Sequence, residues 1–157
     1  MKAIQTKQFA NAILLPEVVK FLNEGKTVTL RLKGYSMRPF LENNRDKALL
    51  VKPSKIAVGD PVLAEISPKH YVLHRIIKIE GNDVTLMGDG NLGVEYCKKE
   101  NIVGAVIGFY RKDRKNLDST DGWKWKLYSK VWMTLRPLRR YLLAFYRKLW
   151  MPIFGAI

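Results

Sequence analysis

Polar and hydrophobic positions alternate in short runs through the first 111 residues, a pattern typical of strands with one buried face. Turn residues separate six such runs, at residues 27–33, 47–51, 62–66, 70–79, 84–87 and 102–110. One earlier segment, residues 16–23, carries apolar residues at helical spacing instead, and Gly25 follows it as a helix stop. The pattern predicts a mainly β domain with an N-terminal helix.

The C-terminal part has a different composition. Residues 112–121 mix both charges with small polar residues and resemble a linker, whereas residues 122–157 contain eight Lys or Arg, no acidic residue and all four tryptophans. Apolar residues at helical spacing on both sides of Pro137 predict two amphipathic helices: Tyr128, Val131, Trp132 and Leu135, then Leu138, Tyr141, Leu142, Phe145 and Leu149. We therefore divide the chain into a domain (1–111), a linker (112–121) and a helical tail (122–157).

The net charge of +14 implies an anionic partner. Two arrangements of the tail fit this charge. In one, both helices pack on the β domain and their charges are solvated. In the other, the tail from Trp123 to Trp150 lies at an anionic membrane surface, with aromatic rings at headgroup level. We expect the membrane arrangement, because the tail is rich in aromatic residues, has no acidic residue and ends in the apolar run Met151 to Ile157. Binding to nucleic acid would also explain the charge, but it explains less well why the aromatic residues gather on an apolar stripe.

Targeting and cofactor signals are few. The apolar run from Phe9 to Leu15 is too short for a secretory signal, and the longest uncharged run is ten residues, whereas a spanning helix needs about 20. The single cysteine, Cys97, excludes an internal disulfide, and two histidines in unrelated contexts do not form a metal-ligand set. We expect a cytoplasmic protein, peripheral at the inner membrane surface, without a metal or other cofactor.

Three residue types needed for nucleophilic hydrolysis occur in the β domain. Ser36 follows the strand-like run 27–33, and Gly34 between them permits a sharp turn. Pro39 stands where a short helix could begin, and the N–H groups of that helix could stabilise the oxyanion that forms when a serine attacks a carbonyl group. His74 lies within a later run, and Asp89 stands between two glycines. Taken alone, a Gly-x-Ser turn or a histidine in a strand is more often a structural feature than a catalytic one.

Four motifs occur in order between residues 14 and 109: Gly34-Tyr35-Ser36-Met37-Arg38-Pro39, Gly59-Asp60-Pro61-Val62, His74-Arg75-Ile76 and Gly88-Asp89-Gly90-Asn91. Together they resemble the signal peptidase and SOS-repressor superfamily of serine peptidases (the S24/S26 group). That resemblance implies a fold of coiled antiparallel sheets. Many members have a catalytic lysine where this chain has His74, so the pattern is similar to the Ser-His-Asp form of archaeal and endoplasmic-reticulum signal peptidases.

By this resemblance Ser36 is the nucleophile, His74 the general base and Asp89 the acid that orients it. Glu95 corresponds to a second acidic residue in those relatives, and Met37 shapes the turn. The chain departs from the family at Gly34, where the endoplasmic-reticulum type has a serine that offers a hydroxyl to the oxyanion. It also lacks a membrane anchor before the nucleophile and a preceding helix-turn-helix domain, so a DNA-binding repressor is not expected.

We therefore expect a serine endopeptidase that cleaves a peptide or a membrane-associated precursor through an acyl-enzyme on Ser36. Two alternatives stay open from the sequence. One is a non-catalytic module that binds peptide or membrane on the same fold. The other is a self-cleaving switch like the repressors.

Overall fold

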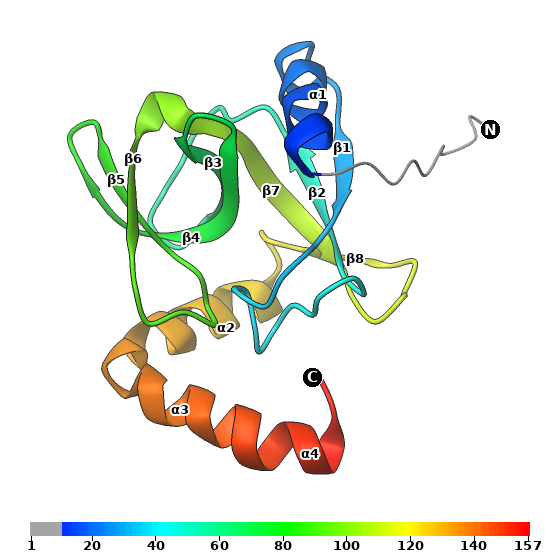
Figure 1. Cartoon of the computed structure of the whole chain (residues 1–157), viewed down its shortest axis with the longest axis vertical. Coiled ribbons are helices and arrows are strands. Elements are labelled where there is room, and N and C mark those ends of the chain that lie inside the picture. The colour runs from blue at the N-terminus through cyan, green and yellow to red at the C-terminus, as the bar shows by residue number, and fades with distance from the viewer. Residues whose placement is uncertain (1–10) are drawn as a thin grey trace.

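Residues 11–157, which the computed structural model describes, contain eight strands in one antiparallel sheet (Figure 1). The strands are β1 (Val28–Arg31), β2 (Lys47–Val51), β3 (Pro61–Ser67), β4 (His70–Glu80), β5 (Asp83–Met87), β6 (Glu95–Lys98), β7 (Ile102–Tyr110) and β8 (Leu117–Ser119). They are ordered β1-β2-β7-β3-β4-β5-β6, and β8 pairs with β7. The prediction of a sheet-rich domain is confirmed. Residues 1–10, which the predicted domain included, lie outside the described part.

Two of these strands, β6 and β8, were not predicted. β6 is short, and its sequence Glu-Tyr-Cys-Lys places polar residues at both ends, so it lacks the run of apolar positions that marks a strand. It is an edge strand that contains the half-buried Cys97. β8 lies inside the expected linker, residues 112–121, where it extends the sheet beside Gly108 to Tyr110 of β7.

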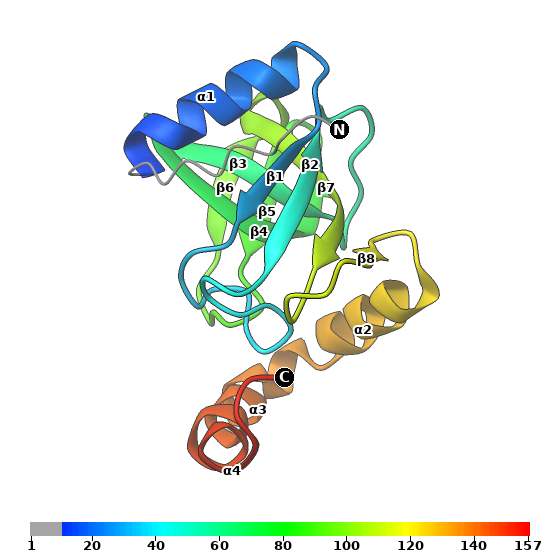
Figure 2. The same ribbon diagram turned by 90° about the vertical axis from the view of Figure 1, so that its right-hand side faces the viewer.

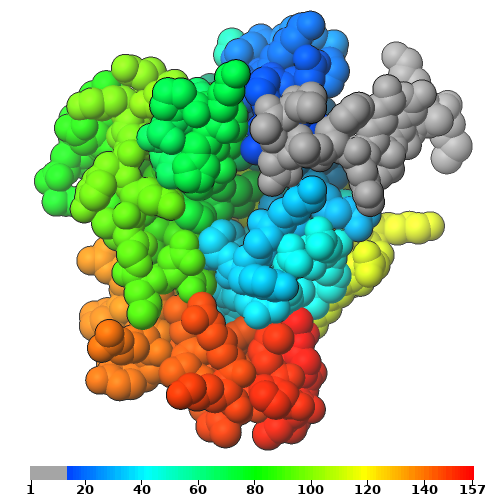
Figure 3. All heavy atoms as spheres, in the orientation of Figure 1, coloured from blue at the N-terminus to red at the C-terminus, as the bar shows by residue number. Residues whose placement is uncertain are grey.

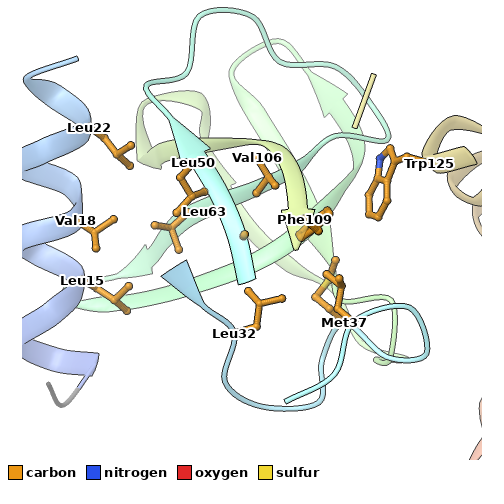
Figure 4. Packing of buried hydrophobic residues seen from close by; sticks show 12 residues of the cluster. Leu15, Val18, Leu22, Leu32, Met37, Leu50, Leu63, Val106, Phe109 and Trp125 are labelled. Atoms are coloured by element: carbon orange, nitrogen blue, oxygen red, sulfur yellow. The ribbon is translucent and has the colours of Figure 1, made fainter. Parts of the chain in front are cut away.

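The N-terminal helix α1 (Asn11–Asn23) covers one end of the sheet, as Figure 2 shows. Its buried side chains Leu15, Val18 and Leu22 face Leu50 and Leu63 of the sheet (Figure 4). The helix was predicted over residues 16–23 and begins earlier than that. The helix ends at Asn23, and Gly25 follows in the turn with a φ of +77°, in the left-handed region that glycine adopts readily.

The sheet carries shifts of register at several places, between β2 and β7, β3 and β4, β3 and β7, and β4 and β5. Such bulges bend a sheet and increase its twist. A second apolar cluster forms within the strands β3 to β5 and the start of β7, and β6 contacts β3 although two strands lie between them in the sheet order. The bending therefore brings the edge strand β6 back toward the middle of the sheet.

The tail forms helices at the end of the molecule opposite α1 (Figures 1 and 2). Helix α2 (Trp123–Thr134) is followed by the single 3₁₀ turn η2 (Arg136–Leu138), which contains Pro137. Helix α3 (Arg139–Phe145) then continues through a π-helical segment, η3 (Tyr146–Trp150), into α4 (Met151–Phe154). The predicted break at Pro137 is confirmed.

The tail has two different faces. Its inner face packs on the domain through six buried residues: Trp125, Ser129, Trp132, Arg139, Leu143 and Tyr146. Its outer face exposes large apolar side chains: Trp123, Leu127, Val131, Leu138, Tyr141, Phe145, Leu149, Ile153 and Phe154. Packing on the domain therefore accounts for the inner face only, and the apolar outer face lies in solvent.

None of the helices in residues 11–157 has both the length and the apolar character needed to cross a bilayer.

Candidate active site

The segment that carries Ser36 is a series of turns between β1 and β2. Gly34 has a φ of +89°, a conformation that favours glycine, and its N–H donates to Asn43 Oδ1 at 2.8 Å. The Ser36 carbonyl oxygen accepts a hydrogen bond of 2.7 Å from the Gly90 N–H. The short helix expected at Pro39 does not form. Residues 36–40 are turns, in which the Leu41 N–H donates to the Met37 carbonyl oxygen at 3.1 Å and the Arg38 N–H to the Tyr35 carbonyl oxygen at 3.2 Å.

Met37 anchors this segment in the hydrophobic core. Its side chain is buried near Phe109 and Trp125, which come from β7 and α2 (Figure 4). Ser36, the residue before it, is only half-buried. The role expected for Met37, to shape the turn, stays a prediction.

Ser36 and His74 line the same cavity, which has a volume of about 140 Å³. The rest of its lining is mostly apolar: Leu32, Met37, Leu41, Tyr71, Val72 and Leu73, with Gly34, Lys33 and Glu42. Pockets that hold a whole small-molecule ligand usually measure about 300–1,000 Å³. This cavity is therefore suited to a single side chain or another small group.

His74 lies on β4 opposite Val62 of β3, and only 4% of its surface is exposed. Its ring nitrogen Nδ1 lies 2.5 Å from Glu95 Oε2, which leaves Nε2 as the nitrogen able to accept a proton. Burial lowers the pKa of His74 below its ordinary value, and the Glu95 carboxylate partly opposes this effect. The imidazole is therefore neutral at pH 7, as a general base must be.

Glu95 reaches His74 because of the bend in the sheet. It is the first residue of β6, opposite Leu86 of β5, and its side chain is about one-third exposed (34%). From the sequence, Glu95 was expected only in support of an Asp89–His74 pair. In the structure it is the carboxylate that contacts the ring.

Asp89 does not have the position expected of it. Its two carboxylate oxygens accept hydrogen bonds of 2.8 and 2.7 Å from Arg75 Nε and Nη2, and both residues are fully buried (0% exposed). The negative charge of Asp89 also raises the pKa of His74, but it contributes less than the Glu95 carboxylate does. The physical reason is the alternation of side chains along β4, since His74 and Arg75 point to opposite faces of the strand. Asp89 lies on the Arg75 side, so its assignment as the orienting acid is corrected.

Residues of the tail complete the surroundings of Asp89, and sequence reasoning missed their role. The Tyr128 hydroxyl donates to Asp89 Oδ2 at 2.8 Å, and Trp132 Nε1 donates to the Asp89 carbonyl oxygen at 3.1 Å. Ser129 Oγ accepts a hydrogen bond of 2.5 Å from Arg75 Nη1. These residues are about forty or more positions from their partners along the chain, and helical spacing contains no signal for such contacts.

Comparisons of the sequence with models of known protein families and with curated proteins gave no match. The function is therefore inferred from the site itself. The site combines a serine, a buried neutral histidine and a carboxylate on the far ring nitrogen. This is the set of groups that activates a hydroxyl for attack on an acyl carbon.

Proposed function

We propose that this protein is a serine endopeptidase of the signal-peptidase and SOS-repressor type, with Ser36 as nucleophile and His74 as general base. Glu95 takes the orienting role that the sequence had assigned to Asp89. The observation that carries the proposal is the 2.5 Å contact between His74 Nδ1 and Glu95 Oε2, beside the cavity that Ser36 also lines.

In the proposed reaction, Ser36 Oγ attacks the carbonyl carbon of a peptide bond while its proton passes to His74 Nε2. The Glu95 carboxylate stabilises the imidazolium that forms and holds Nδ1 in its protonated state. His74 Nε2 then returns the proton to the departing amine, which leaves an ester on Ser36. Water activated by the same imidazole hydrolyses this ester and releases the second product.

The substrate class is a peptide or precursor protein with a small side chain next to the scissile bond. The size and the apolar lining of the 140 Å³ cavity support this choice, since they leave room for a side chain and not for a larger ligand. The finer fold assignment, a coiled sheet of the signal-peptidase type, belongs to the same proposal. The register shifts and the contact between β6 and β3 support it.

We also propose that the peptidase is peripheral to an anionic membrane, which the outer face of the tail contacts. Two features of the tail support the proposal. Its outer face exposes an apolar and aromatic stripe along α2 to α4, and the tail also exposes seven of its eight basic residues, one of which, Arg147, donates to the Gly90 carbonyl oxygen. Apolar and basic side chains on one helical surface are typical of helices that lie in the membrane interface.

A second candidate function, a non-catalytic peptide-binding module, is favoured by one observation. Position 34 has no hydroxyl to offer an oxyanion, and the Gly34 N–H is already engaged by Asn43. A site without oxyanion donors would still bind a peptide beside Ser36 but would cleave it poorly.

Incubation of the purified protein with a diverse mixture of synthetic peptides distinguishes these two functions. The peptidase proposal predicts new peptide termini by mass spectrometry, with small residues enriched before the cleaved bond. The Ser36→Ala variant, which keeps the cavity, is expected to give none. Binding of peptides by both proteins without new termini would support the module and contradict the peptidase.

A further inference from the structure

The inner face of the tail contacts all three residues of the turn from Gly88 to Gly90. Tyr128 donates to the Asp89 carboxylate at 2.8 Å and Trp132 to the Asp89 carbonyl oxygen at 3.1 Å. The remaining two contacts go to the neighbouring carbonyl oxygens, from Arg147 Nη2 to Gly90 at 2.8 Å and from Arg139 Nη1 to Gly88 at 3.5 Å.

The same turn lies directly against the backbone of the Ser36 segment, residues 32–46 between β1 and β2. The Gly90 N–H donates to the Ser36 carbonyl oxygen at 2.7 Å. A Cβ atom on Gly88 would stand 2.4 Å from that oxygen, and one on Gly90 would stand 2.6 Å from the Tyr35 carbonyl oxygen. The two segments are therefore in contact without room for a side chain, and a shift of the turn displaces Ser36.

A second path connects the tail with this segment. The ring of Tyr128 stacks on Phe40, with centroids 4.5 Å apart, and Trp125 contacts Phe40 edge-on, with centroids 5.0 Å apart. At the far end of the tail, the Ile157 carbonyl oxygen accepts a hydrogen bond of 2.8 Å from Arg45. Figure 3 shows this cyan segment directly above the orange and red helices.

We propose that the helical tail is a positioning element of the active site, in which Tyr128 and Trp132 hold the Gly88–Gly90 turn that fixes the Ser36 backbone. This inference rests on the proposed function for its catalytic consequence, since Ser36 is the nucleophile there. Tyr128 and Trp132 act through Asp89 and Gly90 and do not touch the reacting atoms.

The hydroxyl of Tyr128 is suited to this role at any pH at which the protein would work. Burial and the adjacent Asp89 carboxylate raise the pKa of Tyr128 well above its ordinary value of 10. The hydroxyl therefore stays protonated and continues to donate to Asp89. Removal of the oxygen alone, in Tyr128→Phe, deletes this hydrogen bond and keeps the ring that stacks on Phe40.

The tail itself offers matched controls for the test. Tyr141 and Trp123 are each 70% exposed on its outer face, so Tyr141→Phe and Trp123→Phe make the same chemical changes without touching the turn. Two quantities are measured on the full chain: hydrogen exchange at the Gly90 amide by NMR, and the rate at which a fluorophosphonate probe labels Ser36. The Tyr128 hydroxyl donates to the charged Asp89 carboxylate, and the loss of such a hydrogen bond in Tyr128→Phe should change each quantity by about tenfold.

We expect Tyr128→Phe and Trp132→Phe to exchange faster at Gly90 and to label more slowly at Ser36, while both controls behave like the wild-type protein. Unchanged exchange at Gly90 in both inner-face variants overturns the inference. The inference is also overturned if hydrogen exchange in these variants accelerates equally at the Gly90 amide and at the core amide of Val62, because that result would show a global loss of stability. If wild-type protein does not label but Gly90 responds as expected, the positioning by the tail stands and the proposed peptidase function fails.

Discussion

Replacement of Glu95 by glutamine is expected to lower the rate of Ser36 acylation by about 10⁴-fold, the loss typical when the orienting carboxylate of a Ser-His pair becomes an amide. A glutamine side chain still fits beside His74 Nδ1, but its amide does not stabilise the imidazolium and favours the wrong tautomer of the ring. Because Glu95 is about one-third exposed (34%) and lies on an edge strand, the fold should tolerate the change. The rate is measured with a cleaved peptide or a fluorophosphonate probe, and folding is followed by thermal unfolding.

Glu80→Gln is the control for this variant. Glu80 is also a strand carboxylate with a basic partner, Lys78, but it is exposed and does not contact His74. It should retain the wild-type rate. A large loss of rate in Asp89→Asn together with a wild-type rate in Glu95→Gln would contradict the roles that the geometry assigns to the two carboxylates.

The second large effect concerns stability. We expect Asp89→Ala to lower the free energy of unfolding by about 3–5 kcal/mol, the usual cost of removing one partner of a buried ion pair. The variant leaves the guanidinium of Arg75, which is 0% exposed, without its bidentate partner. It also removes the acceptor of the Tyr128 hydroxyl. Urea-induced unfolding, followed by circular dichroism, measures the change.

Asp83→Ala provides the comparison for Asp89→Ala. Asp83 forms an ion pair with Lys98, but both side chains are more than half exposed, and such surface pairs contribute little to stability. If the two variants lost similar amounts of stability, or if Asp89→Ala lost almost none, the buried Arg75–Asp89 pair would not stabilise the fold as its burial and hydrogen bonds indicate.

Much of the β domain could be predicted from the sequence, because alternation of apolar and polar residues reports directly on which side of a strand is buried. The run 84–87, for example, corresponds to β5, and the helix stop at Gly25 is where the sequence indicates it. β6 could not be found in this way. Its four residues have no apolar run, and it exists because β5 offers a free edge.

The candidate site was predictable only in part. Ser36 and His74 were recognised from their motifs, and the structure brings both to one cavity. The choice between Asp89 and Glu95 could not be made, because it depends on which face of β4 each carboxylate meets after the sheet has bent. The adjacent residues His74 and Arg75 point to opposite faces of β4. The sequence does not show which of these two side chains Asp89 contacts.

The tail illustrates a similar limit. Helical spacing correctly predicts two helices around Pro137, but it groups Tyr128, Val131 and Trp132 into one stripe. In the structure Trp132 is buried, Tyr128 stacks against Phe40, and Val131 faces outward. A helix with apolar residues on two sides gives a broad stripe in the sequence, and only the packing separates the two faces.

If His74 activates Ser36 as proposed, the rate of fluorophosphonate labelling depends on pH through the ionisation of the imidazole. Only the neutral imidazole accepts the proton of Ser36. Since burial holds the pKa of His74 below its ordinary value of about 6.5, the rate should be constant near pH 7. It should then fall tenfold per pH unit on the acid side of that lowered pKa. We predict one adduct, mapped to Ser36 by mass spectrometry and absent from Ser36→Ala and His74→Asn. An adduct at another residue, or equal labelling of Ser36 in His74→Asn at every pH, would contradict the claim.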